Sequence, residues 1–79
     1  MYLEIVTPDK KIFGGDIKLI QVPGNKGQFE VLRNHAPIIS SLANGKIKVI
    51  LPEGEKNYYD IKGGVIEVQN NKVIVLAEM

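Results

Sequence analysis

Few residues of this chain have the types and spacing that chemistry requires. Nucleophilic catalysis of the Ser-His-Asp kind needs a serine, a histidine and a carboxylate in hydrogen-bonded contact. The one histidine is His35, and the residues available to join it are Ser40, Ser41, Asp9, Asp16 and Asp60. No nucleophile-elbow motif and no glycine-rich oxyanion turn accompanies them. We therefore expect no catalytic residue. The imidazole is expected either to hydrogen-bond backbone within residues 33–37 or to lie at a partner surface.

Metal and phosphate chemistry have equally little material. The chain has no cysteine, and one histidine with scattered carboxylates does not supply the three or four ligands of a zinc site. The run Gly24-Asn25-Lys26-Gly27 contains glycines and a lysine, as a phosphate cradle does. It lacks the spacing of a P-loop and no helix is expected after it, so a hairpin tip is the better interpretation. We expect no metal and no cofactor.

Size and charge restrict the remaining possibilities. With 79 residues, 44% of them hydrophobic, the chain is expected to form one domain, residues 1–79. Ten Lys and Arg against nine Asp and Glu argue against a broad basic face for nucleic acid. No apolar run approaches the roughly 20 residues that cross a bilayer, and the first residues do not resemble a signal peptide. We expect no direct membrane insertion. The chain should stay where it is made unless a partner carries it to a membrane, and the absence of cysteine fits a reducing compartment such as the bacterial cytoplasm.

Turn-forming residues recur about every ten positions, with short β-rich runs between them. This spacing is typical of an all-β sandwich or flattened barrel, and no stretch has helical periodicity. We expect a small two-sheet fold of about eight to ten short, mostly antiparallel strands. The runs that predict strands are residues 2–6, 17–22, 28–32, 38–42, 46–51, 56–61, 65–69 and 72–76.

Three local features carry specific expectations. The apolar residues of 17–22 do not alternate strictly, which predicts a β-bulge there. Residues 43–45 resemble a short hairpin turn, with Gly45 supplying positive φ. Asn70 and Asn71 predict the tightest turn of the chain, because asparagine tolerates the left-handed backbone of a type I′ turn.

Two pairs of neighbouring residues are expected to divide between core and surface. Successive side chains of a strand point to opposite faces of a sheet. One of Tyr58 and Tyr59 should therefore be buried while the other faces solvent or a partner. The same holds for Ile38 and Ile39.

The order of several short motifs resembles the epsilon subunit family of F-type ATP synthases. The resemblance covers almost the whole chain, at the family's spacing, and is strongest at His35-Ala36-Pro37. The matching blocks are residues 3–15, Gln21-Val22-Pro23-Gly24, Gly27-Gln28-Phe29, Val31-Leu32, His35-Ala36-Pro37, residues 63–68 and residues 73–78.

The sequence departs from the family pattern in two respects. Glu30 stands where the family usually has glycine, and Arg33-Asn34 replace Pro-Gly. Asn34 is expected to take the positive φ of that glycine, so the turn should survive. The family generally also carries a C-terminal pair of regulatory helices after the segment that matches residues 75–78. We expect that helical domain to be lacking here.

The resemblance implies a non-catalytic subunit of the central stalk, which docks on the gamma subunit and the c-ring and couples proton flow to ATP synthesis. It implies a peripheral position in a complex at the cytoplasmic face of the bacterial inner membrane. By similarity, the gamma contacts are Thr7, His35, Ala36, Pro37 and Ser40. By similarity, the c-ring contacts are Gly24, Asn25, Lys26, Gly27, Gln28 and Phe29.

Three other functions compete with this one. A small β-barrel that binds single-stranded nucleic acid would need exposed aromatic residues beside a basic groove, and the chain has five aromatics and a net charge of +1. An enzyme built around His35 would need the partners discussed above. A protein-interaction module of an unrelated complex is the third alternative.

Overall fold

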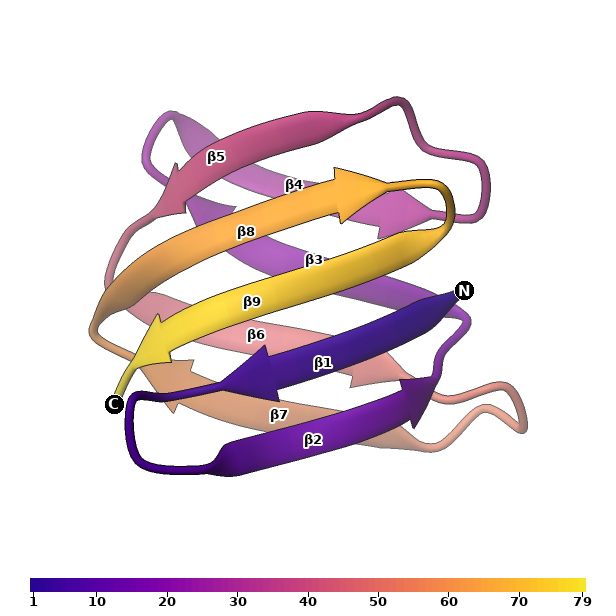
Figure 1. Ribbon diagram of the computed structural model, residues 1–79, viewed down its shortest axis with the longest axis horizontal. Helices are drawn as coiled ribbons and strands as arrows, with labels where there is room; N and C mark the ends of the chain where they lie inside the picture. The colour runs from indigo at the N-terminus through magenta and orange to yellow at the C-terminus, as the bar shows by residue number, and fades with distance from the viewer.

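The computed structural model describes all of residues 1–79, and nine strands account for most of them (Figure 1). The strands are β1 (Tyr2–Val6), β2 (Lys11–Asp16), β3 (Leu19–Gly24), β4 (Gly27–Leu32), β5 (Ile38–Leu42), β6 (Gly45–Ile50), β7 (Lys56–Ile61), β8 (Gly63–Gln69) and β9 (Lys72–Glu78). The all-β prediction of eight to ten short strands is confirmed.

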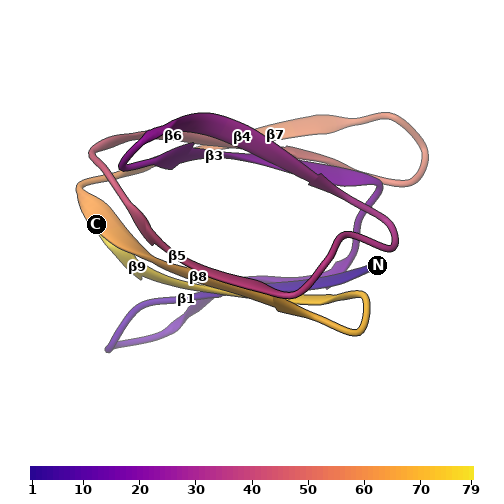
Figure 2. The same ribbon diagram turned by 90° about the horizontal axis from the view of Figure 1, so that it is seen from above.

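The strands form two layers that face each other (Figure 2). The first layer has the order β2-β1-β9-β8-β5, and the second has the order β4-β3-β6-β7. One bridge, between Gly24 of β3 and Leu42 of β5, connects them. Every pairing is antiparallel except that of β1 with β9. The predicted two-sheet, mostly antiparallel sandwich is therefore the observed architecture.

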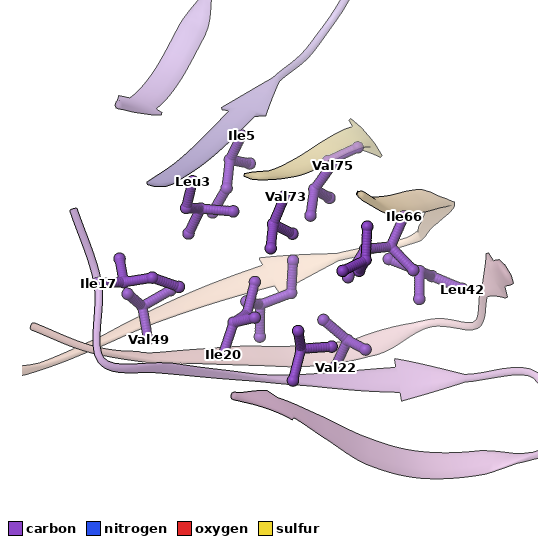
Figure 3. Close-up of a cluster of buried hydrophobic side chains, with 14 of the residues drawn as sticks. Leu3, Ile5, Ile17, Ile20, Val22, Leu42, Val49, Ile66, Val73 and Val75 are labelled. Carbon is purple, nitrogen blue, oxygen red and sulfur yellow. The ribbon is translucent and has the colours of Figure 1, made fainter. Parts of the chain in front are cut away.

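Alternating side chains of both layers meet between the sheets and form one core. Figure 3 shows Leu3, Ile5, Val73 and Val75 of the first layer opposite Ile20 and other residues of the second. Fifteen buried side chains make up this core, all of them apolar. Burial of such side chains contributes about 1.5–3 kcal/mol each and offsets the entropy lost on ordering the chain.

The bulge predicted in residues 17–22 is wrong. Ile17 precedes β3 and reaches the core from the connection, where its N–H donates to the Met1 carbonyl at 2.8 Å. Within β3 the alternation is regular, with Ile20 and Val22 buried. The register irregularity lies instead in β1, between Ile5 and Val6.

Strand β2 was not predicted, because its sequence Lys-Ile-Phe-Gly-Gly-Asp has two glycines and charged ends. Pairing with β1 imposes the extended conformation despite this weak local preference. Phe13 of β2 lies against Tyr59 of β7, edge to face with ring centroids 6.5 Å apart. This contact joins the two layers along the side of the sandwich where β2 and β7 lie.

The hairpin turn predicted at residues 43–45 is also wrong. Strand β5 pairs with β8, whereas β6 pairs with β3 and β7, so the connection crosses from one layer to the other. Neither Asn44 nor Gly45 takes positive φ. In contrast, Asn70 (φ 52°) and Asn71 (φ 60°) both do, which confirms the tight turn between β8 and β9.

Candidate protein-docking surface

The loop between β4 and β5 holds His35 through the backbone. The His35 N–H donates to the Leu32 carbonyl at 3.1 Å, and its Nδ1 donates to the Ala36 carbonyl at 2.7 Å. A ring whose Nδ1 carries the proton presents Nε2 as an acceptor when it is neutral. The histidine bonds neither a serine nor a carboxylate. Its expected role as a backbone-bonded residue of segment 33–37 is confirmed.

Two asparagines clasp this loop to the β8–β9 turn. The Asn34 N–H donates to Asn71 Oδ1 at 2.7 Å, and Asn71 Nδ2 donates to Asn34 Oδ1 at 3.2 Å. Asn34 has a φ of 66°, so it takes the left-handed conformation expected where the family has glycine. The clasp fixes the start of a loop in which Ala36 and Pro37 are exposed.

Thr7 lies at the opposite end of the first layer. It follows Val6, which pairs with Leu76 of β9. Leu76 pairs in turn with Val65 of β8, and Val65 pairs with Ser41 of β5. The hydroxyl of Thr7 accepts the N–H groups of Asp9 and Lys10 at 3.3 and 3.2 Å, and closes the β1–β2 turn. Thr7 and Pro37 are separated by three strand spacings of about 4.8 Å and by five residues of strand rise, which makes them about 20 Å apart. The structure therefore does not cluster the five residues assigned to gamma.

Ser40 occupies the middle of β5, on the face that points between the layers. It is half-buried, and its hydroxyl donates to the Ser41 carbonyl at 3.2 Å. Ile38 packs on the core from the same face, whereas Ile39 points outward, 73% exposed. The expected division of Ile38 and Ile39 between core and surface is confirmed.

All six residues assigned to the c-ring lie together at the β3–β4 hairpin. They line one side of an open hollow of about 600 Å³, and Ile38, Ile39, Ser40 and Ser41 of β5 line the other. Gly24 is required here, because a Cβ would lie 2.7 Å from the Gly27 carbonyl oxygen. Glu30, in the place of a family glycine, points to solvent and accepts Gln21 Nε2 at 3.3 Å.

Sequence reasoning missed an exposed apolar surface on the first layer. We call Val6, Val65, Ile74 and Leu76 the outer apolar patch. Val6, Leu76 and Val65 are in register across β1, β9 and β8, and Leu76 is 55% exposed. An open hollow of about 450 Å³ separates this patch from the Thr7-Pro8 turn. The sequence signal was present, because Val73-Ile74-Val75-Leu76 is apolar on both faces of its strand.

An ion pair borders this face on β1 and β2. Lys11 Nζ lies 3.0 Å from Glu4 Oε2, and the Tyr2 hydroxyl donates to the same carboxylate oxygen at 3.4 Å. The hydrogen bond from Lys11 holds the pKa of Glu4 below its ordinary value, and the same bond raises the pKa of Lys11. The second ion pair, Lys46 with Asp60 at 2.7 Å, lies on β6 and β7.

The polar groups of the molecule are spread over its surface. No group of three or more His, Asp or Glu residues converges as a metal site would, and no polar side chain is buried. Tyr59 packs on the core and Tyr58 is exposed, as expected. The structure has no helix of the length and hydropathy that spanning a bilayer takes.

Comparison with known proteins gave matches in sequence over nearly the whole chain. The family model described as the ATP synthase delta/epsilon chain β-sandwich domain matches residues 1–79. The ATP synthase epsilon chain of Chlorobaculum tepidum is 42% identical over 76 residues, which are 96% of this chain and 86% of that one. The epsilon chain of Chlorobium limicola is 38% identical with the same coverage.

Two solved structures share the fold. A chain of the Euglena gracilis mitochondrial ATP synthase, in a structure of OSCP, F1 and the c-ring, superposes with a TM-score of 0.90 and 28% identity over 98% of this chain. This chain spans about half, 49%, of that one. A chain of the Tetrahymena thermophila mitochondrial ATP synthase, from the central stalk and c-ring, gives a TM-score of 0.86 at 18% identity. The match covers 99% of this chain and 63% of that one, and at this identity it shows the fold alone.

Proposed function

Because this chain belongs to the family of ATP synthase delta/epsilon chains through their β-sandwich domain, we propose that it is the docking domain of a central stalk. In this role residues 1–79 form one folded unit that binds the gamma subunit and the c-ring and transmits rotation between them. The domain is the non-catalytic kind of subunit that its epsilon-chain relatives are.

The outer apolar patch is the observation that carries the proposal. Its residues lie on three adjacent strands, and Leu76 and Val65 stay exposed although both are large and apolar. An apolar sheet face is stable in water when another element covers it. Nothing in this chain covers the patch, which suits a surface that a partner protein fills.

The position of Thr7, which the family resemblance assigns to the contact with gamma, supports gamma as that partner. Thr7 borders the same hollow as Val6, Val65 and Leu76. From there the outer face of β9 and β8 leads to β5 and the exposed Pro37. One partner about 20 Å wide would therefore contact Thr7, the outer apolar patch and the loop that carries His35, Ala36 and Pro37. Ser40 would touch the part of this partner that reaches round the edge of β5.

The β3–β4 hairpin is proposed as the contact with the c-ring. Its two tip residues, Asn25 and Lys26, are exposed and polar, and Gln28 is exposed beside them. A contact with polar loops of the c-ring requires such polar side chains, because hydrogen bonds and charges determine how two polar surfaces align. We place the complex at the cytoplasmic face of a bacterial plasma membrane, with the domain peripheral to the bilayer.

Co-purification tests the proposal. We expect the tagged chain, expressed with the gamma subunit of the same synthase, to elute with gamma as one complex on size exclusion. The tagged chain with the substitution Tyr58→Asp is the control, because Tyr58 lies on the second layer, away from the outer apolar patch. Separate elution of the unaltered chain and gamma at micromolar concentration would contradict the proposal.

A further inference from the structure

The sandwich has four edge strands, and two of them, β4 and β5, lie on a side where a hollow opens between the layers. Strands β2 and β5 end the first layer, and β4 and β7 end the second. On one side, the Phe13–Tyr59 contact joins β2 to β7. On the other, the hollow of about 600 Å³ separates β4 from most of β5. Strand β5 pairs with a strand of the second layer at its last residue only, through the Leu42–Gly24 bridge.

The hydrogen bonds at that end show which groups of β5 face away from β8. The Asn25 N–H donates to the Ser41 carbonyl at 3.2 Å, and the Ala43 N–H donates to the Pro23 carbonyl at 2.7 Å. Backbone groups of every second residue point the same way in an antiparallel strand. The Ile39 N–H, the Ile39 carbonyl and the Ser41 N–H therefore point away from β8. No other strand pairs with β5 at these residues.

This edge also lacks the protection that the other three edges have. Natural edge strands usually carry charges, prolines or bulges that prevent another strand from adding. Strand β2 has Lys11 and Asp16, β4 has Glu30, and β7 has Lys56 and Asp60. The run Ile-Ile-Ser-Ser-Leu of β5 has no charge, and its Ile39 is the most exposed large apolar side chain of the molecule.

We infer that the free edge of β5 accepts an extended strand from the partner protein, which continues the first layer by β-augmentation. This inference rests on the proposed function and states how the rotor partner is held. The added strand is short, because Pro37 has no N–H at one end and Asn25 occupies the Ser41 carbonyl at the other. Its backbone accepts hydrogen bonds from the Ile39 N–H and the Ser41 N–H and donates one to the Ile39 carbonyl.

The side chains of the added strand are constrained by what flanks the edge. Those on the outer face lie beside Ile39, which favours an apolar residue. Those on the inner face enter the hollow, whose single charged lining residue is Lys26. A neutral or acidic residue is therefore favoured there over a basic one.

Amide hydrogen exchange tests the inference directly, with the purified gamma subunit of the same synthase as the probe. The amides of Ile39 and Ser41 should exchange rapidly in the free chain and slow at least tenfold in the complex. The amides of Gln28 and Glu30, which face outward from β4, serve as the comparison. Binding with no protection of Ile39 and Ser41 would overturn the inference and leave the proposed function standing, whereas absence of binding would overturn both.

A proline variant supplies the second test. Ser41→Pro removes the outward N–H but no bond to β8, and proline is tolerated on an edge whose N–H faces solvent. Ser41→Ala keeps the N–H and is the matched control. We expect Ser41→Pro to weaken binding of gamma about tenfold and Ser41→Ala to leave it within about twofold, with both variants folded by circular dichroism. Equal affinities would overturn the inference. A dimer of the free chain with Ile39 and Ser41 protected would also do so, in favour of a second copy as the added strand.

Discussion

At the scale of single residues, the Glu4–Lys11 pair gives stability a dependence on pH. The pKa of Glu4 is lowered in the folded chain, so its contribution is complete above its ordinary pKa of 4.5 and is lost as the pH falls through the folded value. The pKa of Lys11 is raised, so its contribution is present below its ordinary 10.5 and is lost as the pH rises through the folded value. The pair therefore stabilises the fold at neutral pH.

Replacing the lysine tests this assignment. Lys11→Gln should lower the melting temperature slightly at pH 7 and by less at pH 3, because the contribution of Glu4 is lost as the pH falls below 4.5 through its lowered folded pKa. The effect is small because Lys11 is exposed, and 1 M NaCl should reduce it further. Lys56→Gln is the control, since Lys56 makes no ion pair. A loss of the same size at pH 3 and pH 7 would assign the effect to packing of the lysine stem instead.

At the scale of the strands, the sheet under the outer apolar patch depends on one glycine. Gly64 has a φ of 153°, and a Cβ at this position would collide with the Leu76 carbonyl oxygen of the neighbouring strand. Its backbone conformation is one that side chains with a Cβ rarely adopt. The close approach of β8 to β9 at Leu76 therefore requires glycine.

Gly64→Ala should lower the free energy of unfolding by about 2 kcal/mol or more, measured by urea denaturation. Gly15→Ala is the control, because a Cβ there would lie 3.7 Å from the nearest atom, Phe13 Cζ. The control should change stability by less than about 1 kcal/mol. If the two variants were equally stable, the strain assigned to position 64 would not exist.

The elements that sequence predicted best are those that local chemistry determines. The turn at Asn70 and Asn71 needs two residues with positive φ, and two asparagines supply them side by side. Strands β5 and β7 begin and end where their β-rich runs do. In contrast, β2 and the crossing after Leu42 depend on which strand lies alongside, and pairing partners leave no mark in a short stretch of sequence.

The candidate docking surface divides in the same way. Resemblance of sequence predicted Thr7, His35 and the β3–β4 hairpin as contacts with partners, and Thr7, His35 and the hairpin tip lie in the connections between strands. The outer apolar patch was missed because it combines Val6, Val65 and Leu76 from three strands that are distant in the chain. The parallel pairing of β1 with β9 brings them together, and no local pattern predicts it.

At the scale of the whole molecule, the domain joins a small core to large exposed contact surfaces. A chain of this length buries only about 60% of the surface that it exposes when unfolded, so its stability is modest. A partner that binds the folded state alone adds to that stability by mass action. We expect the outer apolar patch, the β5 edge and the β3–β4 hairpin to be the surfaces that partners cover.

The most direct test of the central claim is isothermal titration of purified gamma subunit with three forms of the chain. Leu76→Asp places a charge in the outer apolar patch, and Tyr58→Asp places the same charge at a side chain of similar exposure, 53% against 55%, on the second layer. We predict that the unaltered chain and Tyr58→Asp bind gamma with the same affinity, and that Leu76→Asp binds at least tenfold more weakly. Equal binding by Leu76→Asp and the unaltered chain, or no binding by any form, would contradict the account.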